Sequence, residues 1–247
     1  MTHSLDLTKF LSPGSQCRIG AHVVPFPGDP RHRVIGYDQT SPAVIRRQAD
    51  LMQDCGITFT TLDWYGTKTR SQLVLTGWMA EAERRGQFSV AVMADKDSDP
   101  TSPLMTPIYA SSAYLDHLLL TFPGNWNQPL PPTLRHLSHG SGFLWMELPP
   151  AGSLDTPLSI LKRQYSRGQT VMGAIFSGFN DSDPKNPASS VWGGPARHWD
   201  DYLGETWLEC WRVIPAGLKY VQLVTWNDYE EGTALEGTLA MLSGTRI

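Results

Sequence analysis

The chain alternates between capped helical segments and buried strands, and this order admits few folds. Ser41 and Pro42 are typical of an N-cap and a first helical residue, and apolar residues then recur at helical spacing as far as Cys55. Gly56 is expected to stop this helix. The β-branched and aromatic run 57–66 that follows predicts a buried strand.

The same order recurs along the chain, with further helices expected over 71–85, 157–167 and 199–214. Seven strands are expected, near residues 18–26, 57–65, 88–95, 117–122, 142–148, 170–179 and 219–227. Strands that alternate with helices form parallel sheets through right-handed crossovers. A doubly wound sheet should carry GxGxxG after its first strand, and this chain does not. We therefore expect a single α/β domain over 1–247, a compact (β/α)8 TIM barrel. Its eighth strand would have to lie in the last 20 residues, which would leave the last βα unit incomplete.

Composition excludes several classes of protein. The net charge of −4 and the absence of a Lys/Arg run argue against a nucleic-acid partner. No uncharged apolar stretch approaches the roughly 18 residues of a membrane span. The first residues lack a signal-peptide pattern, so we expect either a cytoplasmic protein or a secreted one whose leader has been removed. The three cysteines fit no metal or disulfide pattern and are expected to be buried or half-buried thiols. His136 and His139 lack a third ligand, so we expect no metal and no cofactor.

Polar residues gather where the expected strands end, which is where barrel enzymes place their catalytic groups. They are His22, Asp63, Asp95, Glu147, Asp181, Asn227, Asp228 and Glu231. A buried parallel sheet has no structural use for so many carboxylates. Other interpretations stay open: Asp63 and Asp181 as caps or loop hydrogen-bond acceptors, Asp95 in a solvated loop, and His22 as a hydrogen-bonded core residue.

The pair Asp228 and Glu231 is the sharpest chemical signal. If the segment after the strand is helical, the two side chains share one face, with Cβ atoms about 5–6 Å apart. Glycoside hydrolysis needs one protonated and one charged carboxyl group, and Trp226 or Tyr229 could raise one pKa by excluding water. The structural alternative is a helix N-terminus where acids are favoured by the dipole. Glu236 is expected to face solvent or to cap backbone amides.

Two motifs resemble known families. WNDYEEGT (226–233) is similar to the signature of glycoside hydrolase families 71 and 99. The run 36–66, which ends in DWYG, and GFND (178–181) also resemble family-99-like proteins. The resemblance implies a TIM barrel that hydrolyses internal α-linkages, in α-1,3-glucan for family 71 or in α-mannosides for family 99.

Carried across, the resemblance makes Glu231 the general acid and Asp228 its partner. Asp228 would activate water in the inverting family-71 mode, and in the family-99 mode a Glu in its place assists the substrate's 2-hydroxyl. Asp228 and Tyr229 match family 71 better. The expected substrate contacts are Asp63, Trp64, Tyr65, His22, Asp95, Asp181, Trp226, Asn227 and Tyr229.

The expected partner is an oligo- or polysaccharide, and nothing in the sequence sets the oligomeric state. Two other hypotheses remain. One is a catalytically silent carbohydrate-binding barrel or a protein of polysaccharide assembly. The other is a non-sugar hydrolase on the same fold, because fold does not determine function.

Overall fold

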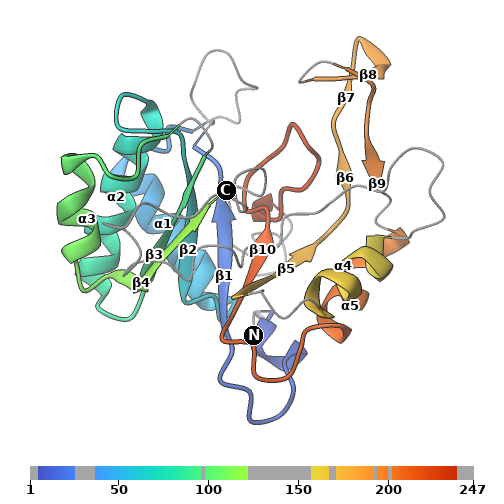
Figure 1. Cartoon of the computed structure of the whole chain (residues 1–247), viewed down its shortest axis with the longest axis horizontal. Coiled ribbons are helices and arrows are strands. Elements are labelled where there is room, and N and C mark those ends of the chain that lie inside the picture. The colour runs from blue at the N-terminus through green and yellow to red at the C-terminus, as the bar shows by residue number, and fades with distance from the viewer. Residues whose placement is uncertain are drawn as a thin grey trace.

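Six parallel strands form the centre of the molecule (Figure 1). The computed structural model describes residues 5–25, 37–95, 98–121, 157–166, 171–191, 194–199 and 202–237. The strands are β1 (Arg18–Val23), β2 (Phe59–Trp64), β3 (Ser89–Ala94), β4 (Tyr114–Thr121), β5 (Met172–Phe176) and β10 (Tyr220–Val224). Their order in the sheet is β4-β3-β2-β1-β10-β5. Strands β1 to β4 are neighbours in chain order, β5 pairs with β10, and β10 pairs with β1, as in a (β/α)8 barrel.

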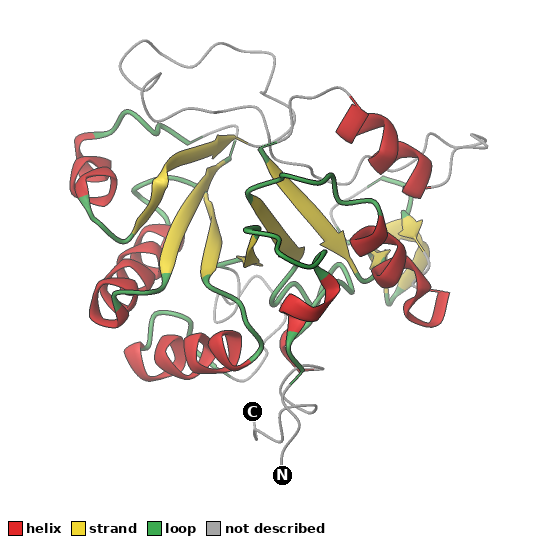
Figure 2. Cartoon of the chain, turned by 90° about the horizontal axis from the view of Figure 1, so that it is seen from below, coloured by secondary structure: helices red, strands yellow, loops and turns green. Residues whose placement is uncertain are grey.

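Helices cover the outer face of the sheet (Figure 2). They are α1 (Pro42–Asp54), α2 (Arg70–Arg85), α3 (Thr106–Ala110), α4 (Pro157–Ser166) and α5 (Glu205–Arg212), with short 3-10 turns at Leu7–Phe10, Pro103–Met105 and Tyr202–Gly204. The main core lies between the sheet and these helices, where Trp64, Trp78 and Met52 are fully buried. Cys55 and Cys210 are buried and Cys17 is half-buried, as predicted.

A second, smaller core lies on the inner face of the sheet and contains only strand residues and Val171, which precedes β5. The rings of Phe59 on β2 and Tyr220 on β10 meet edge to face, with centroids 6.0 Å apart, although β1 lies between those strands. Gly20 on β1 makes this contact possible, because a Cβ there would lie 2.1 Å from the Phe59 ring. Thr61 on β2 likewise donates a 3.7 Å hydrogen bond to the sulfur of Met172 on β5. The sheet is therefore curled around an inner face.

The predicted helices near 41–55, 71–85 and 157–167 are confirmed as α1, α2 and α4. Gly86 ends α2 with a φ of +71°, a left-handed conformation that suits glycine. The helix predicted over 199–214 is wrong in its first part. Leu203 and Gly204 adopt positive φ values, so α5 begins only at Glu205.

Short antiparallel ribbons form in the described residues between β5 and α5, and they were not predicted from the sequence. Trp199 belongs to β9 (His198–Trp199), which pairs with β6 (Phe179–Asn180), and β7 (Ser182–Asp183) pairs with β8 (Asn186–Ser190). Ribbons of two to five residues are too short to show the alternation that marks a strand in a sequence.

The expected position of the eighth strand is also corrected. β10 already lies beside β1, and the described part of the last 20 residues, 228–237, contains no strand. The described residues break off after β4 at residue 121 and resume at residue 157, before α4 and β5. The predicted strand 142–148, with Glu147, and the histidines His136 and His139 fall in that interval, outside the described residues.

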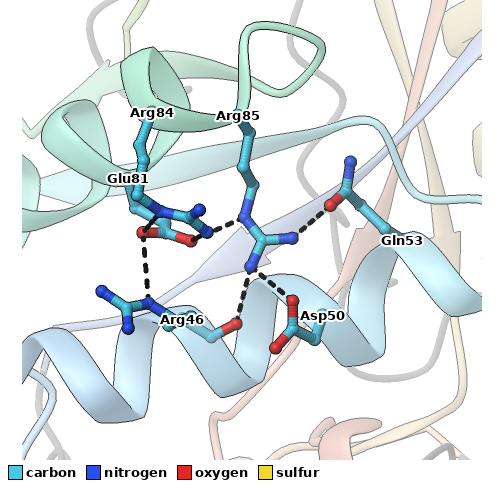
Figure 3. A network of polar contacts seen from close by, with 6 residues as sticks. All are labelled: Arg46, Asp50, Gln53, Glu81, Arg84 and Arg85. Carbon is cyan, nitrogen blue, oxygen red and sulfur yellow. Dashed lines mark hydrogen bonds and ion pairs between the residues drawn. The ribbon is translucent and has the colours of Figure 1, made fainter.

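An ion-pair network ties α2 to α1 (Figure 3). Glu81 is buried and accepts hydrogen bonds from Arg84 at 2.5 and 2.8 Å and from Arg85 at 2.7 Å. Arg85 reaches across to Asp50 on α1, at 2.6 Å. The hydrogen bonds from Arg84 and Arg85 outweigh burial and lower the pKa of Glu81 to about 2. The network therefore needs an ionised Glu81.

The substitution Glu81→Gln is expected to reduce the free energy of unfolding at pH 7 by about 2 kcal/mol, the usual worth of hydrogen bonds to a charged group. A lowered pKa stabilises the folded state above the unfolded pKa, and this stabilisation is lost as pH falls through the folded value. The difference between variant and wild type should therefore shrink as pH falls from about 4.5 towards 2. Urea denaturation at pH 7, 4 and 3 measures it, and Glu83→Gln on the same helix is the control. An equal loss in both variants would contradict the prediction.

Candidate active site

Three carboxyl groups from distant parts of the chain meet at the carboxyl ends of the strands. Asp63 lies at the end of β2, Asp95 directly follows β3, and Asp228 follows β10. The backbone N–H of Asp95 donates to the carbonyl of Trp64 at 3.0 Å, which holds the two strand ends together. The charges of Asp95 and Asp228 both act on the pKa of Asp63. This end of the barrel therefore has the concentration of acids that the sequence predicted.

Asp63 is a protonated acid at neutral pH. Its side chain is only 5% exposed, and burial raises its pKa to about 8. The hydroxyl of Tyr65 donates to its Oδ2 at 2.5 Å and opposes this shift, while the negative charges of Asp95 and Asp228 add to it. Its Oδ1 is buried and has no hydrogen-bond partner among the described residues. A carboxyl kept neutral in this way can donate a hydrogen bond or a proton.

Asp228 organises the segment that carries Glu231. The amides of Glu230 and Glu231 both donate to its Oδ1 at 3.0 Å, and its own amide donates to Thr225 Oγ1 at 2.8 Å. Residues 229–232 form a turn rather than the helix that the spacing argument assumed. Asp228 is buried and Glu231 is half-buried. Through its bond to the amide of Glu231, the carboxylate of Asp228 fixes the backbone of Glu231.

Two residues of the same motif have a structural role, and their contact with substrate stays a prediction. Trp226 is fully buried, and its amide donates to the carbonyl of His22 at 2.6 Å. Asn227 uses its side-chain amide on both backbone groups of Val24, at 2.9 and 3.1 Å. They fasten the end of β10 to the end of β1, and both side chains are buried in this structure.

Trp64 and His22 lie on opposite faces of the sheet, Trp64 in the outer core and His22 on the inner face. Side chains alternate along β2, so Asp63 lies on the inner face while Trp64 packs in the core beneath α2 and donates to Gln72 at 2.9 Å. His22 is fully buried beside Gln222, and burial lowers its pKa to about 3. This burial fits the core interpretation of His22, and its contact with a sugar stays a prediction. Tyr65 stays beside Asp63 as a candidate.

Asp181 is a structural acceptor, the alternative that the sequence left open. It is fully buried and accepts hydrogen bonds from Ser190 and from the amide and Nε of Arg197, each at 2.7 Å. These bonds hold together the ribbons β6–β9 and β7–β8, which project beyond the carboxyl ends of the strands (Figure 1). The amide of Asn180 in β6 donates to the carbonyl of Glu231 at 2.8 Å, so this projection adjoins the candidate pair.

The expectation for Glu236 is wrong, because this residue is buried and only 4% exposed. It accepts hydrogen bonds from Tyr37 at 2.5 Å, Gln48 at 3.0 Å and Tyr229 at 3.3 Å. Tyr37 and Gln48 were not singled out in the sequence. Their only signal is that both fall within the family-like run 36–66.

Metal-ligand clusters and membrane-spanning helices are both absent from the described residues. Among them, no group of three or more His, Cys, Asp or Glu side chains is arranged to hold a metal ion. No helix in the described part of the chain is long and apolar enough to cross a bilayer.

The strand order and the covering helices define a (β/α)8 barrel, and comparison with solved structures identifies the fold as glycoside hydrolase-like. No protein-family model and no curated protein matches the sequence. The GH99 endo-alpha-mannosidase of Bacteroides thetaiotaomicron superposes with a TM-score of 0.59 at 14% identity, covering 88% of this chain and 86% of that one. The complex of that enzyme with bis-tris propane superposes with a TM-score of 0.58 at 14% identity, covering 88% of this chain and 85% of that one. A protein described as glycoside hydrolase-like gives 0.52 at 12% identity, covering 96% of both chains. The predicted resemblance to families 71 and 99 is confirmed at the level of the fold.

Proposed function

We propose that this protein is a glycoside hydrolase that cleaves α-linked glycan with Glu231 as general acid and Asp228 as its partner. One observation carries the proposal. The turn that holds both residues follows β10 at the end of the barrel where Asp63 ends β2 and Asp95 follows β3. Glycosidases bring carboxyl groups together in this way and keep one of them protonated and another ionised.

The surroundings of each group support its role. Two backbone amides donate to one oxygen of Asp228. This arrangement stabilises the ionised carboxylate, which is the form in which a base accepts a proton. That base would take a proton from water or from the substrate's own 2-hydroxyl. Glu231, on the same turn, would protonate the leaving oxygen. Asp63 keeps its proton near neutral pH and would donate a hydrogen bond to a sugar oxygen.

Two substrate classes follow from different observations. Asp228 and Tyr229 match the family 71 pattern, which favours α-1,3-glucan. The structural neighbours described as endo-alpha-mannosidases favour an α-mannoside. In either case the partner is an oligo- or polysaccharide, whose rings would pass beside Tyr65.

The test is sugar release from a panel of α-glucans and α-mannans by wild type and by Glu231→Gln in parallel. Release by wild type that is lost in the folded variant would support the proposal and identify the substrate class. If wild type releases nothing but binds one of these glycans, the barrel is a carbohydrate-binding protein. If it neither cleaves nor binds any of them, the glycosidase proposal fails.

A further inference from the structure

The segment after β10 folds back on itself and forms a closed loop. The amide of Thr225 donates to the carbonyl of Thr233 at 3.2 Å, and their hydroxyls lie 2.8 Å apart. The amides of Leu235 and Glu236 then donate to the carbonyl of Trp226, at 3.1 and 2.9 Å. These bonds fix the base of the loop. Its tip, residues 228–232, carries the candidate catalytic pair.

The tip has its own anchor in Glu236. Glu236 belongs to the base of the loop through its amide, and its carboxylate accepts a hydrogen bond from Tyr229 at the tip. Its other two donors come from elsewhere, Tyr37 from the segment before α1 and Gln48 from α1 itself. Glu236 therefore links the tip to the βα unit that follows the first strand.

From this geometry we propose that Glu236 is a positioning residue, which acts through Tyr229 to set the place of Asp228 and Glu231. The inference rests on the proposed function. Tyr229 lies between the two acids in the chain and begins the turn 229–232, so its hydrogen bond to Glu236 ties this turn to the rest of the fold. A misplacement of about 1 Å in a catalytic group can cost about a hundredfold in rate.

The three donors allow the positioning role to be separated from a purely structural one. Tyr229→Phe removes only the bond to the tip and leaves Tyr37 and Gln48 on Glu236. We expect kcat to fall about tenfold, with KM within twofold and Tm nearly unchanged. Tyr37→Phe removes a bond outside the tip. We expect this variant to have a lower Tm and a nearly unchanged kcat. Tyr109→Phe, which loses a tyrosine hydrogen bond to the carbonyl of Pro100, is the matched control.

A second measurement does not depend on activity. In Tyr229→Phe and Glu236→Gln, amide hydrogen exchange at Glu230 and Glu231 should become about tenfold faster, because those amides are bonded to Asp228 at the tip. Exchange at Val92 in β3 should not change. Faster exchange at the tip supports positioning even if wild type cleaves no glycan, in which case only the proposed function fails. Unchanged exchange overturns the inference, and a loss of activity would then mean that Tyr229 acts on the substrate directly.

Discussion

The substitution Glu231→Gln is expected to lower sugar release by about a thousandfold or more, within the range for removal of a general acid. Glutamine has the same shape but cannot give up a proton to the leaving oxygen. The fold should survive, because Glu231 is half-buried and its backbone bonds to Asp228 and Asn180 do not involve its side chain. The measurement is kcat on the substrate identified by the panel.

Glu230→Gln is the matched control, because Glu230 is the adjacent residue and its amide bonds to the same oxygen of Asp228. It should retain activity within about twofold. Substrates with a good leaving group need less protonation, so Glu231→Gln should lose much less activity on an activated aryl glycoside. Equal losses in the two variants, or equal losses on both kinds of substrate, would count against Glu231 as the acid.

The substitution Asp63→Asn is expected to stabilise the fold, and the gain should grow with pH. Asp63 has a pKa of about 8 when folded against a model value of 3.8, so the folded state holds a proton that the unfolded chain releases. Between these values wild-type stability falls as pH rises, by at most about 1.4 kcal/mol per pH unit. Asparagine does not titrate, so the variant avoids this loss. We expect an advantage on the order of 2–4 kcal/mol at pH 7.

Urea denaturation between pH 4 and pH 9 tests this prediction. The difference between the variant and wild type should be small near pH 4, rise with pH and level off above about 8. Tyr65→Phe removes a hydrogen bond that lowers the pKa of Asp63, so this pKa should rise further in the variant. The stability of Tyr65→Phe should therefore continue to fall at pH values where that of wild type has levelled off. A difference that does not change with pH would show that Asp63 is ionised in the folded protein. Active-site residues often destabilise the folded state, because their environment is arranged for catalysis and not for stability.

Local patterns in the sequence determined the regular framework of this protein. Ser41, Pro42 and Gly56 mark the limits of α1, and Gly86 ends α2, because caps and left-handed glycines act within one turn of a helix. Apolar runs, many of them β-branched, marked the six described strands, and Asp63, Asp95 and Asp228 were among the polar residues noted at strand ends. The alternation of these elements was enough to predict the barrel.

Only the tertiary structure decided what each of these side chains does. Alternation along β2 separates Asp63 from Trp64, but only the packing of α2 shows which of them faces the core. Asp181 and Glu236 look like ordinary loop acids in the sequence. Asp181 is buried with Arg197 as its donor. Glu236 is buried with Tyr37 and Gln48 as donors. Burial and pKa depend on which distant residues meet in space, and a pattern confined to neighbouring residues does not contain that information.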